Sequence, residues 1–245
     1  MSDVHSAYSV LDKHPLGTDV NVVSHYDFLH FLGGKAEAAR VLDGGLARFP
    51  SSWLLHDRLR AKLLAEKGVA GLEPAYEAML AKPGAPPMLE WFAGYTSIVA
   101  AEFLRRAGKT QEALAAYDRA VAHYDRSIEK NAGARASADH YAALAIAGKA
   151  RIALEHKEHD QAVGGVLASF GRCPEAAAAL DGLNLSPVDT AKTLRARLVQ
   201  EKRDDLVARV DEALGRLDPS QLLPPAYEQV GPASRPGSRG RRRGG

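Results

Sequence analysis

The chain has 245 residues, of which 46% are hydrophobic and 25% charged, and a formal net charge of +2. This length is enough to bury a sizeable core, so stability requires no disulfide, metal ion or oligomer. The single cysteine excludes an intramolecular disulfide, and no stretch reaches the roughly 20 apolar residues of a membrane span, so we expect a soluble, cytoplasmic protein that makes no membrane contact.

Residues 1–17 show no helical periodicity and contain a Pro-Leu-Gly turn signal, so we expect a leader or partial cap. After them, apolar residues recur every three to four positions, which is typical of amphipathic helices. Proline and glycine separate these segments, because proline ends a helix and glycine favours its C-terminal cap. The pattern predicts helices over residues 18–31, 36–49, 53–67, 75–82, 86–107, 108–130, 137–154, 161–170, 174–183, 188–199 and 204–217. No stretch shows the two-residue alternation of a strand, so the predicted fold class is all-α.

A short pattern of packing residues recurs along the chain. It consists of a first residue, an apolar, aromatic or small residue four positions later, and a small residue seven positions later. Small residues at fixed points let helices approach closely, so the pattern predicts about five stacked helical hairpins. An alanine-rich bundle without repeats is the alternative. The five copies are Ala113, Tyr117 and Ala120; Ala38, Leu42 and Gly45; Gly71, Ala75 and Ala78; Ala162, Val166 and Ser169; and Leu206, Val210 and Ala213.

Two stretches carry a family resemblance. GKTQEALAAYDRA, from Gly108 to Ala120, has the glycine, alanine, aromatic and second small residue of the second helix of a tetratricopeptide repeat, and Gly33 to Pro50 matches nearly as well. The chain therefore resembles tetratricopeptide repeat proteins over residues 18–219. The resemblance implies a right-handed α-solenoid of about five irregularly spaced hairpins. It also implies a groove, lined by the first helices, that binds a peptide or another protein, and it implies no chemistry and no cofactor.

Counting back from the repeat pattern gives candidate groove residues. Eleven positions before the first residue of each copy stand Asp27, Arg60, Glu102, Arg151 and Arg195. Arginine presents a planar fork of donors that suits carboxylates, so Arg60, Arg151 and Arg195 would form a partly basic stripe in the groove. Glu102 stands at the same offset, and we predict groove binding by these four residues. The alternative is that these side chains are solvated helix faces, since an error of one residue turns a helical position by about 100°.

Motifs for catalysis or metal binding are weak. Gly108-Lys109-Thr110 resembles the end of a phosphate-binding loop but lacks the earlier glycine, so a hairpin turn is the preferred interpretation. His156 and His159 could share a metal ion, although they stand where a turn between helices is expected. No acid and base pair can be singled out, and we predict a protein that is not an enzyme.

The C-terminal residues 220–245 differ in composition from the rest. Five arginines against one glutamate give this tail +4 and leave the remainder of the chain at −2. Its proline, glycine, serine and arginine content predicts disorder. Contact with nucleic acid or another polyanion is the alternative function, against that of a protein-binding scaffold. The candidate contact residues are Arg239, Arg241, Arg242 and Arg243.

Overall fold

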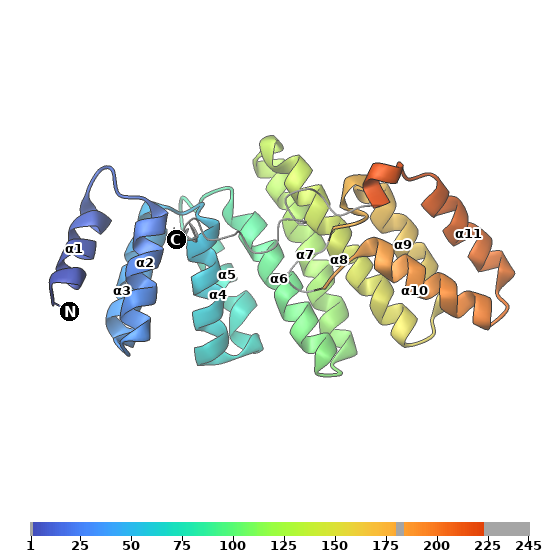
Figure 1. Cartoon of the computed structure of the whole chain (residues 1–245), viewed down its shortest axis with the longest axis horizontal. Helices are drawn as coiled ribbons and strands as arrows, with labels where there is room; N and C mark the ends of the chain where they lie inside the picture. The colour runs from blue at the N-terminus through green and yellow to red at the C-terminus, as the bar shows by residue number, and fades with distance from the viewer. Residues whose placement is uncertain (1, 180–183, 223–245) are drawn as a thin grey trace, which may run out of the picture. The chain divides into compact units, whose positions relative to one another are not determined.

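The computed structural model describes residues 2–179 and 184–222, and these contain eleven α-helices, four short 3-10 helices and no strand (Figure 1). The all-α prediction is therefore confirmed for this part of the chain. The helices are α1 (Ser2–Lys13), α2 (Asp19–Phe31), α3 (Lys35–Arg48), α4 (Trp53–Lys67), α5 (Leu72–Leu80), α6 (Leu89–Arg106), α7 (Thr110–Lys130), α8 (Arg135–Glu155), α9 (His159–Arg172), α10 (Pro187–Gln200) and α11 (Asp204–Gly215).

The chain divides into two compact units, residues 1–145 and 146–245, and the division falls within α8. The sequence had suggested one repeat domain over residues 18–219. We call these parts unit 1 and unit 2 and describe each by itself. In neither is any described helix both long and apolar enough to cross a membrane.

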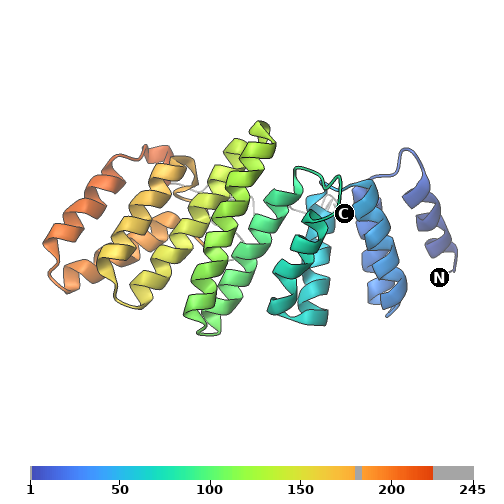
Figure 2. The ribbon, with the colours of Figure 1, turned by 180° about the vertical axis from the view of Figure 1, so that it is seen from behind.

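Unit 1 contains three helical pairs, α2 with α3, α4 with α5 and α6 with α7, whose members lie side by side in both ribbon views (Figures 1 and 2). Local signals set their ends. Thr18 caps α2 in a capping box with Asn21, and Ser52 caps α4 by accepting a hydrogen bond from the Leu55 amide. The first helix of each pair is followed by a glycine at positive φ, namely Gly33, Gly68 and Gly108.

The N-terminal residues were expected to form a leader or partial cap, but Ser2–Lys13 is a helix, α1, that packs on α2. Its end is fixed by Arg48 of α3, whose guanidinium donates hydrogen bonds to the carbonyls of His14, at 2.6 Å, and Gly17, at 3.1 Å. Asp12 also accepts a hydrogen bond from the buried His25 side chain at 2.5 Å. These long-range contacts order a segment whose own sequence has weak periodicity.

The second helix of the second pair, α5, begins later than the repeat count assumed. After Gly68, at φ 65°, residues 69–71 form a short 3-10 helix, η1, and only then does α5 begin. Leu72 and Tyr76 are therefore its buried residues, whereas Ala78 is exposed. The copy Gly71, Ala75 and Ala78 is wrong by one residue, because the 3-10 turn shifts which side chains face the core.

Unit 2 contains the end of α8 together with α9, α10 and α11, which share a core that includes Val166, Leu194 and Val210. Ser186 caps α10 and Pro187 occupies its first turn, as the sequence predicts. The helix predicted over 174–183 is wrong in the described part. Only Pro174–Ala176 is helical, as the 3-10 helix η3, and residues 180–183 lie outside the described residues.

Glycines stand where helices approach closely in both units. A Cβ at Gly45 of α3 would lie 2.5 Å from a methyl carbon of Val22 in α2, and one at Gly94 of α6 would lie 2.9 Å from the Tyr124 ring in α7. In unit 2, a Cβ at Gly165 of α9 would lie 2.8 Å from the Ala150 Cβ in α8. These distances are shorter than side chains tolerate, so glycine at these positions permits the close approach.

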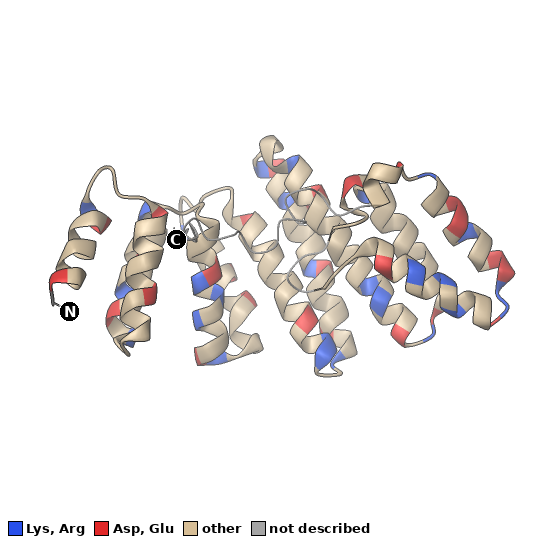
Figure 3. Ribbon diagram, viewed as in Figure 1, with Lys and Arg blue, Asp and Glu red and all other residues tan. Residues whose placement is uncertain are grey.

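Charge is distributed unevenly over the helices of unit 1. Acidic and basic residues both occur along α4, whereas α6 carries no charged residue from Trp91 to Ala101 (Figure 3). Nearly all of that stretch is buried, since α6 packs against both α5 and α7. The middle of α6 is thus apolar and buried, and the charged residues of this helix stand at its two ends.

Candidate functional site

The most distinctive group of side chains in unit 1 is aromatic and comes from α4, α6 and the first half of α8. Trp53 is the first residue of α4 and follows the N-cap, Ser52, so the cap fixes the position of Trp53 in the helix. Trp91 and Tyr95 stand four residues apart in α6 and therefore share a face of that helix. We call Trp53, Trp91, Tyr95 and Tyr141 the aromatic surface.

The rings of the aromatic surface form one continuous contact. Trp53 meets Tyr95 edge to face at 4.8 Å between ring centroids and meets Trp91 at 5.5 Å. Tyr141 in turn meets Trp91 at 5.0 Å and Tyr95 at 5.5 Å, again edge to face. Edge-to-face pairs at these separations are each worth about 0.5–1.5 kcal/mol beyond their burial. The contacts join side chains from three helices that are distant in sequence.

Exposure differs among the four rings. Trp91 is 5% exposed, and its Nε1 donates a hydrogen bond to the Ser137 hydroxyl at 3.0 Å. Trp53 is 38% exposed, and Tyr95 and Tyr141 are half-buried. A fixed inner ring thus supports outer rings that solvent or a partner can reach.

Arg60 lies against this surface. It stands seven residues after Trp53 in α4, two helical turns on, and its guanidinium carbon is 4.8 Å from the centre of the Trp53 ring and 4.7 Å from that of Tyr95. The residue is only 3% exposed. Both rings therefore stabilise the cation through their faces.

His56, one turn before Arg60, is part of the support beneath. It is 1% exposed and stacks on Phe92 at 3.7 Å between ring centroids. Its Nε2 donates to the Pro50 carbonyl at 3.0 Å, which leaves Nδ1 to accept from the Tyr76 hydroxyl, also at 3.0 Å. Burial lowers the pKa of His56 from 6.5 to about 4. The imidazole is therefore neutral at physiological pH.

The buried carboxylates of unit 1 are used to hold α6 and α7 together. Glu90 accepts hydrogen bonds from His123 and Lys130, each at 2.7 Å, and from Arg126 at 3.2 Å. Burial alone would raise the pKa of Glu90, but these bonds, with the charge of Arg126, hold the pKa below its ordinary value. An ionised, fully paired carboxylate of this kind fixes helix packing.

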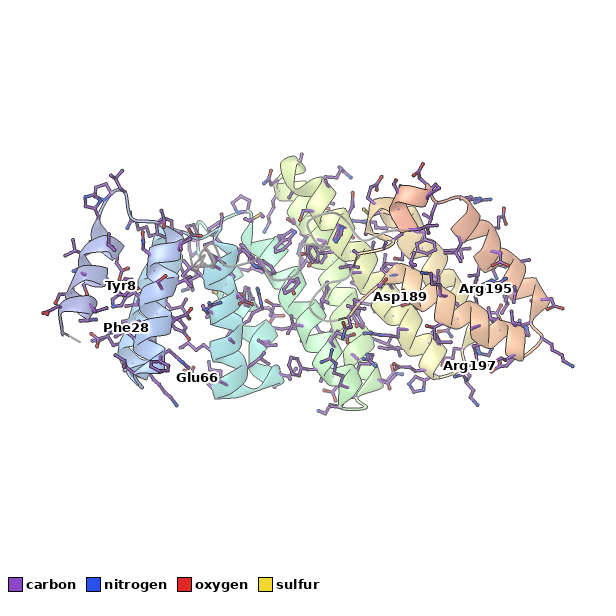
Figure 4. All side chains as sticks on the ribbon, viewed as in Figure 1. Tyr8, Phe28, Glu66, Asp189, Arg195 and Arg197 are labelled. Atoms are coloured by element: carbon purple, nitrogen blue, oxygen red, sulfur yellow. The ribbon has the colours of Figure 1, made fainter. Side chains whose placement is uncertain are left out.

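The four candidate groove residues do not share one environment. Arg60 and Glu102 belong to unit 1, whereas Arg151 and Arg195 belong to unit 2. In unit 2, Arg195 lies on α10 (Figure 4) and pairs with Asp211 of α11. Arg151 donates a hydrogen bond to the Asn184 carbonyl at 3.1 Å. Each arginine thus has a different kind of neighbour.

Glu102 requires a correction. It is 0% exposed and accepts a hydrogen bond from the Tyr117 hydroxyl of α7, while Arg105 pairs with it at 3.3 Å. Its carboxylate is enclosed because the C-terminal half of α6 packs on α7. Glu102 is therefore an interior residue of the helical pair and has no access to a groove.

The six residues that the sequence assigned to repeat packing are all buried, with at most 1% exposure: Ala38, Leu42, Ala113, Tyr117, Ala120 and Ala162. By contrast, the tail residues assigned to polyanion contact lie outside the described residues. These are Arg239, Arg241, Arg242 and Arg243.

The motifs considered for chemistry lie at helix ends. Gly108, at φ 73°, forms the turn between α6 and α7, where the Lys109 amide bonds back to the Leu104 carbonyl. His156 lies in the turn after α8, whereas His159 begins α9 and pairs with Glu201 at 3.2 Å. Among the described residues, no group of three or more histidine, cysteine or acidic side chains is placed to hold a metal ion.

The sequence analysis missed the aromatic surface. Trp53, Trp91 and Tyr95 fall within the helices predicted over residues 53–67 and 86–107, and no further role was assigned to them. One signal was present: both tryptophans of the chain stand near the starts of these two predicted first helices, where leucine or alanine would satisfy packing.

The fold defines the class of the chain, an all-α protein built in unit 1 from paired helices. No known family model matches it, and no curated protein matches its sequence.

Proposed function

We infer that this chain is a non-enzymatic interaction scaffold, and that unit 1 holds a peptide or a partner helix of another protein. The helical pairs would then be tetratricopeptide-like hairpins, with the partner lying along their first helices. This proposal concerns binding alone and requires no cofactor.

One observation carries the proposal: the aromatic surface and Arg60 come from α4, α6 and α8, which are the first helices of successive hairpins in that arrangement. Tryptophan, tyrosine and arginine are the residues that most often dominate binding energy at protein interfaces. A 38% exposed tryptophan supported by a fixed inner ring resembles such an anchor.

The polar chemistry of unit 1 also supports binding. Glu90 and Glu102 are occupied in pairing α6 with α7, and His56 is occupied by Pro50 and Tyr76. A general acid or base must be free to exchange a proton with a substrate. These groups serve packing instead.

The proposal is tested with a pool of random nonapeptides, acetylated and amidated, passed over the immobilised full-length chain. Trp53→Ala should lower peptide retention at least about tenfold, as expected for loss of an aromatic anchor. Phe31→Ala is the matched control, because Phe31 is an aromatic residue of α2 that is 87% exposed and has no part in the aromatic surface. Equal retention by wild type and Trp53→Ala, with both folded by circular dichroism, would contradict the proposal.

The alternative function, nucleic-acid contact through the basic tail, is separated by deleting residues 231–245. The deletion removes all five tail arginines. A scaffold that uses unit 1 should retain the same peptides after this deletion, whereas a function that depends on the tail should be lost.

A further inference from the structure

Arg60 differs from the other well-placed arginines of unit 1. Arg58 binds Asp27 through two hydrogen bonds of 2.8 Å, and Arg119 binds Glu73 through bonds of 2.8 and 2.6 Å. Arg60 is more deeply buried than either, yet within the described part of the chain neither Nη1 nor Nη2 has a hydrogen-bond partner. The charge of Arg60 opposes the burial that raises the pKa of Tyr76, but the guanidinium makes no hydrogen bond of good geometry with the Tyr76 hydroxyl.

A buried guanidinium without acceptors is costly. The rings of Trp53 and Tyr95 stabilise its charge, but aromatic rings do not replace acceptors for its N–H groups. Removing such a charge from water is normally offset by a hydrogen-bonded anion. A carboxylate within hydrogen-bond distance of the guanidinium edge would supply these acceptors.

Asp57 shows where that carboxylate can enter. Its Oδ1 is 3.5 Å from Nη2 of Arg60, which is longer than a charge-assisted hydrogen bond, and its other oxygen is drawn to Arg58 at 3.1 Å. The Asp57 side chain is 53% exposed. The Nη2 edge of the guanidinium is therefore the one that faces an exposed side chain.

We propose that Arg60 is the specificity determinant of the aromatic surface and binds an aspartate or glutamate side chain of the partner peptide, displacing Asp57. This inference rests on the proposed function, because the peptide must already lie on the aromatic surface. Arg58 and Arg119 show the geometry in which arginines of this unit hold acidic side chains, two parallel hydrogen bonds of 2.6–2.8 Å. Asp57 acts as an internal competitor for the same edge.

The test uses three pools of acetylated nonapeptides, random except at the centre. The first has a central aspartate and an amidated C-terminus, the second a central asparagine and an amidated C-terminus, and the third a central asparagine and a free C-terminal carboxylate. Wild type should retain the aspartate pool about tenfold better than either asparagine pool, as expected for a charge-assisted hydrogen bond.

Arg60→Met should remove this preference, to within about twofold, because methionine keeps an apolar stem beside the rings but has no donor. Lys62→Met is the control, since it removes a positive charge from the same helix at a residue that pairs with Glu66 instead. Asp57→Asn, which keeps Arg60 in place, should improve retention of the aspartate pool about two- to threefold. Asp57→Asn therefore tests the proposal even if Arg60→Met fails to fold.

The possible outcomes separate the two proposals. Equal retention of the two amidated pools, with both lost in Trp53→Ala, would leave the scaffold function standing and overturn the role of Arg60. Preference for the free C-terminal pool would likewise overturn the assignment to an acidic side chain. Retention of no pool would contradict the scaffold function and this inference together.

Discussion

His56 and Arg60 are buried bases one helical turn apart in α4, and they differ in how their polar atoms are satisfied. Both ring nitrogens of His56 have partners, Pro50 and Tyr76, and the ring stacks on Phe92. Arg60 lies against two aromatic rings, but in the described part of the chain its Nη1 and Nη2 have no hydrogen-bond partner. His56 therefore belongs to the structural support of unit 1, whereas the unsatisfied donors of Arg60 are the basis of the binding role proposed for it.

Acid should destabilise the folded chain through His56, whose pKa is about 4 in the folded chain against 6.5 ordinarily. Between these pH values the unfolded chain binds a proton that the folded chain does not. The contribution of His56 to the free energy of unfolding is thus intact above pH 6.5. It falls by about 3 kcal/mol as the pH drops to 4.

Urea unfolding of wild type and His56→Gln at pH 7, 5.5 and 4.5 checks this. His56→Gln should be less stable at pH 7, because the imidazole contacts are lost, but its midpoint should fall less steeply with acidification. Parallel curves for the two proteins would show that another group causes the acid sensitivity.

Counting back from the repeat pattern selected Arg60 as a groove candidate, although the count started one residue too early. The count began at Gly71, which lies in η1, whereas the buried residue that opens α5 is Leu72. The same count placed Glu102 in a groove, although Glu102 bonds to Tyr117 inside the helical pair. Counting positions along the sequence cannot predict a 3-10 turn or the burial of an acidic side chain, because both depend on contacts with other helices.

Two adjacent glycines of α9 should respond in opposite ways when alanine replaces them. Gly164 and Gly165 are neighbours in α9, but a Cβ at Gly165 would meet Ala150 at 2.8 Å, whereas one at Gly164 meets no atom within 4 Å. Gly165→Ala should therefore cost about 1–3 kcal/mol through overpacking. Gly164→Ala should stabilise by about 0.5–1 kcal/mol, because alanine is the better helix former.

Thermal unfolding of the two variants beside wild type measures both effects. Because the residues are adjacent, any general effect of adding a methyl group to α9 is the same for both. Similar melting temperatures for Gly165→Ala and Gly164→Ala would mean that α8 and α9 do not approach as closely as the structure has them.

Most helices were predictable from sequence because their signals are local. Thr18 and Ser52 cap α2 and α4, and Pro187 begins α10, all within the segment that they define. The helix α1 and the delayed start of α5 were missed for the opposite reason. Arg48 of α3 holds the end of α1 from 34 residues away along the chain, at His14.

For the part of the chain that the structure describes, the all-α fold followed from periodicity. The division into units 1 and 2 did not, since α8 runs through it without any break in its sequence pattern. The aromatic surface was also beyond reach. Trp53 and Tyr141 stand 88 positions apart, and only the packing of α6 between them brings their rings into one cluster.

The central claim is that the aromatic surface binds the partner, and both tryptophans of the chain, Trp53 and Trp91, lie in it. The chain therefore gives two indole N–H signals in a proton–nitrogen correlation spectrum, and both report on this surface. Titration with a peptide retained by the wild-type chain should shift both signals, Trp53 more because it is the more exposed. A peptide that binds and leaves both indole signals unmoved would contradict the claim.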